Sequence, residues 1–195
     1  MLDGMARWAP DTRERLRAAA LELFEERGFG ATTVPDIVER AGVTRRTFFR
    51  HFSDKREVFF GDDEIPSRAT AMLRSAPLEV PPFAIAWTGL RALAVERFEP
   101  RRDQMAASRR IIEAEPSLRE RDLQKQADLR EAIRAGCAER GSDPLTSRVV
   151  AGVTVELLQT ALERWLADED GMPLTRHLDE VRERMSGVLG SPLPS

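Results

Sequence analysis

The amino-acid sequence predicts an all-α protein of about nine helices in two domains, over residues 1–60 and 61–195. Strand signals are nearly absent, because the chain has no tyrosine and no run of β-branched residues alternates at a period of two. Apolar residues instead recur at helical spacing along most of the chain, and Ser, Thr, Asp, Gly and Pro stand where helices begin and end.

The first two helices are bounded by local signals. The first carries one apolar stripe and ends at Gly28, because glycine accepts the left-handed backbone that closes many helices. The second begins after Thr33, which forms a capping box with Asp36 three residues later. Pro35 occupies the first turn, where a missing N–H removes no helical hydrogen bond.

The third and fourth helices follow without a long loop. Gly42 forms a tight turn, and Thr44 caps a short third helix that buries Phe48 and Phe52. The fourth helix is expected to begin near Lys55. A helix, a tight turn and a short second helix form the pattern of a helix-turn-helix.

Residues 61–195 predict a second helical domain. Prolines open several of its helices, since proline is tolerated in the first turn. The most apolar helix covers residues 146–168, and a last one runs from about 174 to 189. The other expected helices begin at Pro81-Pro82, Pro100 and Pro116.

Composition excludes several classes. The chain of 195 residues has an apolar fraction of 42%, typical of an ordinary globular protein. No run of residues is long and apolar enough for a membrane span or a signal-peptide core, so we expect a cytoplasmic protein without a membrane partner. Cys137 is the only cysteine, and the two histidines lie far apart, so neither a disulfide nor a metal site is expected.

Charge is unevenly distributed. The net charge is −3, yet residues 43–56 carry five basic side chains against one acidic one. Residues 61–195 hold 19 basic and 23 acidic side chains. A short cationic helix on an otherwise acidic protein fits the major groove of DNA and predicts binding to double-stranded DNA at one surface.

The motifs LELFEERGFGATTV and DIVERAGVTRRTFFRHFSDKREVF resemble the N-terminal domain of TetR-family transcriptional regulators. About 50 residues carry this resemblance, and the rest of the chain matches the family in helix pattern only. The resemblance implies a homodimer that places the third helix in the major groove, with a small molecule in the second domain releasing the DNA. The sequence phrase around that helix also resembles a group of regulators some of which sense acyl-thioesters.

The resemblance implies roles for residues of the first domain. Thr33 and His51 correspond to phosphate contacts, and Lys55 to the most regular phosphate anchor. Phe49 stands where the family very often has tyrosine. It lacks the hydroxyl that reaches a phosphate, but its ring can still contact a thymine methyl group or a sugar. The expected DNA-binding set is Thr33, Thr44, Arg45, Arg46, Thr47, Phe49, Arg50, His51 and Lys55.

Candidate residues of the second domain fall into two sets. The first set is a candidate effector site: Trp87, Phe98, Met105 and Arg109. The alternative is that the three apolar residues simply fill the core and that Arg109 lies on a solvated helix face. The second is expected to form a four-helix dimer interface: Val150, Val153, Leu157, Ala161, Leu162, Leu178, Val181 and Met185.

Three functions remain open from sequence. The leading hypothesis is a repressor released from a palindromic operator by a small hydrophobic effector. An activator or a ligand-independent regulator would use the same DNA-binding domain. A helical enzyme or binding protein is the alternative of another class, but with two histidines and no Gly-rich phosphate loop the sequence lacks the expected catalytic constellations, and no cofactor is expected.

Overall fold

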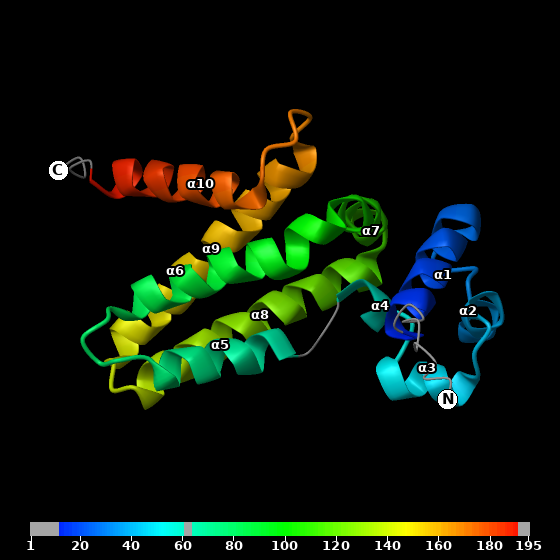
Figure 1. Cartoon of the computed structure of the whole chain (residues 1–195), viewed down its shortest axis with the longest axis horizontal. Coiled ribbons are helices and arrows are strands. Elements are labelled where there is room, and N and C mark those ends of the chain that lie inside the picture. Colours follow the sequence, from blue (N-terminus) through cyan, green and yellow to red (C-terminus); the bar gives the residue numbers. More distant parts are fainter. Residues whose placement is uncertain (1–11, 61–63, 191–195) are drawn as a thin grey trace, which may run out of the picture. The chain divides into compact units, whose positions relative to one another are not determined.

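A computed structural model describes residues 12–60 and 64–190 of the chain. Every regular element in these ranges is helical, which confirms the predicted all-α class (Figure 1). The chain divides into two compact units. The first unit comprises Met1–Gly61 with Ala107–Asp122, and the second comprises Asp62–Ala106 with Leu123–Ser195.

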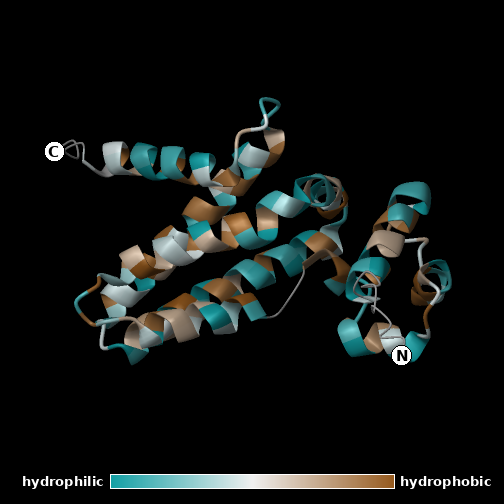
Figure 2. Ribbon diagram, viewed as in Figure 1, coloured by the Kyte–Doolittle hydropathy of each residue, from teal (hydrophilic) through white to brown (hydrophobic). Residues whose placement is uncertain are grey.

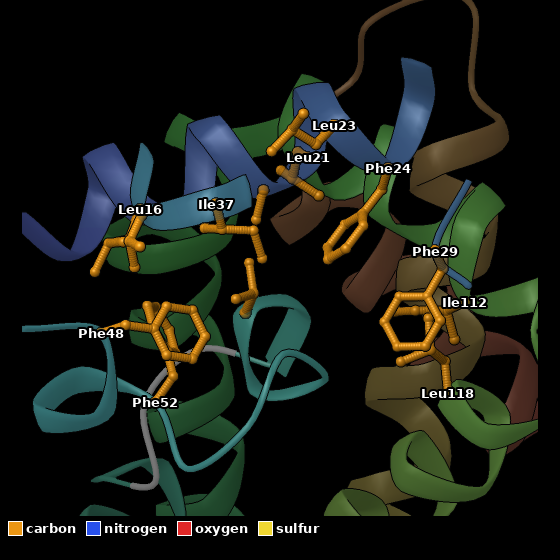
Figure 3. Close-up of a cluster of buried hydrophobic side chains, with 13 residues drawn as sticks. Leu16, Leu21, Leu23, Phe24, Phe29, Ile37, Phe48, Phe52, Ile112 and Leu118 are labelled. Carbon is orange, nitrogen blue, oxygen red and sulfur yellow. The ribbon is translucent and has the colours of Figure 1, made fainter. Parts of the chain in front are cut away.

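The first unit is a small helical bundle built on aromatic and leucine side chains. Its core includes Leu16, Phe24, Phe29 and Phe48, and Figure 3 shows these side chains pointing toward a common interior. Its helices are α1 (Thr12–Arg27), α2 (Val34–Ala41), α3 (Arg45–His51) and the single turn α4 (Glu57–Phe60).

The segment Ala107–Asp122 also belongs to the first unit. It contains the end of α7 (Arg102–Ala114) and the beginning of α8 (Pro116–Glu139), so each of these helices contributes residues to both units. Ile112 and Leu118 complete the core around Phe29. The sequence-based division at residue 60 does not include this segment.

The second unit packs its helices around two apolar clusters. In Figure 1, α5, α6 and α8 run alongside one another and α9 crosses α6 at an angle, and hydrophobic residues recur along α6 and α9 in Figure 2. One cluster centres on Trp87 and Trp165, and the other on Leu73 and Ile133. The remaining helices are α5 (Glu64–Ser75), α6 (Pro82–Leu93), α9 (Pro144–Ala167) and α10 (Leu174–Leu189).

Two features of the second unit differ from the sequence prediction. The described residues contain ten α-helices instead of about nine, because α5 is a helix of its own. Between α6 and α7 the chain stays helical through a π-helical turn, Ala94–Phe98, and a 3-10 turn, Glu99–Arg101. Pro100 explains this irregularity, since it has no N–H for an ordinary helical hydrogen bond.

None of the helices described here has both the length and the apolarity that crossing a lipid bilayer requires.

Candidate nucleic-acid interface

The turn between α2 and α3 is set by Gly42 and two threonine caps. Gly42 has a φ of 64°, a left-handed conformation that ends α2 and lets its N–H donate to the carbonyl of Glu39. Thr33 caps α2 and Thr44 caps α3, each accepting a backbone N–H from three residues onward. These caps are where the sequence predicted them, and they begin α3 directly after the turn.

Two consecutive phenylalanines in α3 differ in burial. Phe48 is 0% exposed and packs 5.4 Å from Phe52 in the core of the first unit. Phe49 is 56% exposed, although its ring meets that of Phe48 edge-on at 5.4 Å. The buried ring therefore fixes the rotation of α3 about its axis, and that rotation turns the next side chain outward.

The outward surface of α3 is cationic. Arg45, Arg46 and Arg50 are all exposed, and Phe49 lies among them in sequence. No acidic residue stands in the first turn of the helix. The structure thus brings together, on one short helix, the positive charge and exposed apolar ring that reading a DNA groove requires.

The threonine hydroxyls are already engaged inside the protein. Asp36 accepts hydrogen bonds from both the backbone N–H and the hydroxyl of Thr33, and these bonds hold the pKa of Asp36 below its usual value. The hydroxyls of Thr44 and Thr47 lie 2.9 Å apart and share one hydrogen bond. Thr33 thus directs its donors to a carboxylate, whereas the Thr44–Thr47 pair keeps one hydroxyl hydrogen for another acceptor.

His51 closes α3 beside an arginine. Its Nε2 atom lies 3.5 Å from a guanidinium nitrogen of Arg50, and both side chains lie at the solvent-exposed end of the helix. A phosphate contact from His51, as the resemblance implies, would use its other ring nitrogen, Nδ1.

Lys55 points into the first unit. Its ammonium donates to the carbonyl oxygens of Phe29 at 2.7 Å and Thr32 at 2.9 Å, and it lies 4.2 Å from the centre of the Phe29 ring. Partial burial lowers the pKa of this ammonium below its usual value, and the nearby carboxylate of Glu115 opposes that shift. Lys55 also precedes α4, which begins at Glu57, instead of opening that helix.

The predicted effector residues separate into two places. Trp87, Phe98 and Met105 belong to the same apolar cluster of the second unit. Arg109 belongs to the first unit, where it forms ion pairs with Glu113 at 2.8 Å and Asp122 at 3.1 Å. The structure therefore groups the three apolar candidates and assigns Arg109 to a surface charge network.

The predicted dimer residues divide by burial. Four are buried within the single chain, in the two apolar clusters of the second unit: Val150, Leu157, Ala161 and Leu178. These side chains are unavailable on the surface of a single chain. The other four keep part of their surface exposed: Val153, Leu162, Val181 and Met185.

Three charged residues that the sequence analysis did not single out stabilise helix ends in the second unit. Glu99 accepts the N–H of Thr175 at 3.0 Å and so caps α10, while Arg102 donates to the carbonyls of Trp165 and Asp168 at the end of α9. Arg140 reaches the end of α5 in the same way. These partners lie 60 or more residues away in sequence, so no local pattern predicts them.

The cationic helix α3 is the second helix of a helix-turn-helix and packs on the core of the first unit. This arrangement is typical of DNA-binding transcriptional regulators. Comparison with known families agrees with this class. Residues 16–60 match the family model described as bacterial regulatory proteins of the tetR family, and residues 86–190 match the MftR C-terminal domain. The chain belongs to the TetR family of transcriptional regulators.

One relative supports this assignment along most of the chain, and two solved structures share the fold. The putative mycofactocin biosynthesis transcriptional regulator MftR of Mycobacterium tuberculosis is 30% identical over 164 residues, 81% of each protein. The TetR-family repressor FadR of Thermus thermophilus, solved with lauroyl-CoA, has a TM-score of 0.54 at 22% identity and covers 94% of this chain and 98% of its own. A SmeT–triclosan complex has the same TM-score at 18% identity, covering 94% and 99%.

Proposed function

We propose that this regulator is a homodimeric repressor that leaves a palindromic operator when a small hydrophobic effector binds the second unit. The observation that carries the proposal is α3, whose Arg45, Arg46 and Arg50 are exposed while Phe48 of the same helix is fully buried. Such a helix offers several cations to one groove without burying any of them. A DNA-binding regulator acts where the genome is, so we expect it in the cytoplasm, and the family assignment favours regulation over catalysis.

A selection experiment tests DNA binding. The full chain is mixed with random-sequence duplexes, and bound DNA is selected and sequenced. We expect an inverted repeat whose half-sites lie about 10 base pairs or a multiple apart, since a two-fold dimer reads successive major-groove faces. Failure to recover any enriched sequence would contradict the proposal, as would enrichment of a single unrepeated site.

The apolar cluster of the second unit supports a hydrophobic effector. Trp87, Phe98 and Met105 lie in that cluster, and the last two are only partly buried there. Lauroyl-CoA and triclosan, the compounds named for the two structural neighbours, provide probes of two chemical kinds. Under this proposal, at least one member of a panel of acyl thioesters and apolar aromatic compounds releases the selected operator.

The direction of the change in transcription distinguishes a repressor from an activator. Measuring transcription from the operator in vitro gives the sign: we expect the protein to lower transcription and the effector to restore it. An increase in transcription with the bound protein would make the chain an activator. Genes for mycofactocin biosynthesis are the first targets to test, because the Mycobacterium tuberculosis relative is named for them.

A further inference from the structure

The segment that leads into α2 is held by two polar side chains, the buried Thr32 and the half-buried Lys55. Phe29 to Thr33 connect the end of α1 to the cap of α2. Thr32 is 0% exposed, and its hydroxyl lies 3.1 Å from the Leu23 carbonyl and 3.0 Å from the Gly28 carbonyl. Lys55 donates to the carbonyls at both ends of the Phe29–Thr32 stretch.

The Lys55 ammonium interacts with groups of the first unit. Two of its three N–H bonds end on carbonyl oxygens, and its ammonium also lies over the Phe29 ring. Glu115, at the corner between α7 and α8, adds a nearby negative charge. A cation that is partly compensated in this way attracts phosphate less than the exposed arginines of α3 do.

The anchored segment determines where α2 begins. Lys55 lies two residues before the start of α4, so its two hydrogen bonds join the end of the helix-turn-helix to its beginning. Phe29 extends the same anchorage to Ile112 and Leu118 in the core. Without the ammonium, the Phe29 and Thr32 carbonyls would lose their partner and the cap of α2 would lose its support.

We infer that Lys55 is a positioning residue for operator binding, which orients the N-terminus of α2 against α3 through the Phe29 and Thr32 carbonyls and makes no phosphate contact of its own. This inference rests on operator binding by the first unit. It differs from the role that the family resemblance implies for Lys55, and the difference has a measurable consequence in the protein without DNA.

The test uses Lys55→Met, which keeps the aliphatic stem and removes the ammonium. Hydrogen exchange of the full chain without DNA should show faster exchange of the amides from Gly30 to Ile37. The matched variant Thr32→Val loosens the same segment and leaves every charge in place. Lys125→Met removes the only other lysine and should leave exchange in this segment unchanged. Unchanged exchange at Gly30–Ile37 in Lys55→Met would overturn the inference.

Operator affinity provides the second measurement, at a temperature where circular dichroism shows every variant folded. Lys55→Met and Thr32→Val should each weaken binding by about tenfold or more, since hydrogen bonds to charged or buried groups are lost. Both variants should give the same slope of log affinity against log salt. A lost phosphate contact would instead make the Lys55→Met slope shallower by about 0.9 per subunit, or about 1.8 per dimer. A slope difference of that size between the two variants would show that Lys55 is a phosphate anchor.

A substitute variant and one further outcome complete the test. If Lys55→Met does not fold, Lys55→Gln replaces it, because the amide keeps N–H donors and carries no charge. If the wild type selects no DNA at all, the proposed function fails, while the exchange measurement still decides whether Lys55 holds the segment.

Discussion

At the scale of single residues, Phe49 has the property most specific to this chain. It is a 56% exposed aromatic ring on a cationic helix, and its edge-on contact with Phe48 holds it in place. An apolar ring cannot accept or donate a hydrogen bond in the groove, but it can pack on the C5-methyl group of thymine. The exposed position and the residue type together favour methyl recognition.

Replacing thymines of the operator one at a time by deoxyuridine tests this role, because the change removes only the methyl group. We expect one thymine per half-site at which the wild type loses about 0.5–1 kcal/mol, the order of one buried methyl. Phe49→Ala should be insensitive to the same replacement, whereas Lys125→Met, which lies in the second unit, is the control that should respond as the wild type does. If every thymine affects wild type and Phe49→Ala equally, Phe49 does not contact a methyl group.

Arg46 should contribute to sequence preference as well as affinity. It lies in the first turn of α3, exposed and without an acidic neighbour in that turn. Loss of a bidentate contact to guanine would cost roughly 1–3 kcal/mol per half-site and relax the base preference there. Selection of random duplexes by Arg46→Ala, with Arg45→Ala beside it, gives the two preferences. Unaltered preferences in both variants would exclude base recognition by these arginines.

At the scale of elements, helix ends in the second unit are stabilised by distant charges. Arg140 is the most connected of these residues. Its guanidinium donates to five carbonyl oxygens at distances from 2.7 to 3.3 Å, in the last turn of α5 and the loop that follows: Leu73, Ala76, Pro77, Leu78 and Val80. A cation there satisfies carbonyls that have no partner within the helix.

Arg140→Ala should therefore lower the free energy of unfolding by about 1.5–3 kcal/mol, the range for hydrogen bonds to a charged group. Arg134→Ala is the matched control on the same helix. Its partner Glu131 is an exposed carboxylate at helical spacing, so its loss should cost about 0.5 kcal/mol or less. Urea unfolding of both variants measures the difference, and equal losses would contradict a special role for Arg140.

Glu99 gives a second test at this scale. It caps α10 from the 3-10 turn, through hydrogen bonds from both the N–H and the hydroxyl of Thr175. Glu99→Ala should destabilise the first turn of α10 by about 1 kcal/mol, the usual effect of losing a helix cap. Glu99→Gln keeps an acceptor oxygen and should retain part of that stability. Hydrogen exchange at His177 and Leu178 reports the first turn directly, and equal exchange in Glu99→Ala and wild type would refute the cap.

Local and distant signals explain why the sequence predicted some elements and missed others. Thr33, Gly42 and Thr44 act within four residues of themselves, so spacing alone located the turn and both caps. Arg140 and Glu99 act across 60 or more residues, and only the folded chain brings their partners close. Helix α5 begins at Glu64, between the fourth helix and the one expected at Pro81-Pro82, where the sequence analysis placed no helix.

At the scale of the whole molecule, periodicity identified an apolar face on α9 but not what covers it. Leu157 is 2% exposed because α6 and α10 of the same subunit pack against it, so its apolar character serves the subunit core. A partner subunit has to use side chains that remain accessible. On α9 and α10 these include the half-buried Leu162 and Val181, together with the exposed Val149.

The dimer proposal therefore predicts opposite results for two substitutions on α9. Leu157→Glu places a charge in the subunit core and should unfold the second unit, since an unpaired buried charge costs several kcal/mol. Leu162→Glu places the same charge five residues later on a half-buried face and should leave a folded monomer. Circular dichroism separates the unfolded variant from the folded one, and sedimentation at micromolar concentration gives the oligomeric state.

The Leu162→Glu monomer should then lose most of its affinity for an inverted-repeat operator. One subunit reads only one half-site, and without the dimer the binding of one subunit no longer raises the effective concentration of the second at the other half-site. Its affinity for an isolated half-site should stay close to that of the wild type, since α3 is unchanged. This comparison separates loss of dimerisation from damage to the DNA-binding surface. A wild type that sediments as a monomer at micromolar concentration and still binds the full repeat tightly would show that α9 and α10 do not form the dimer interface.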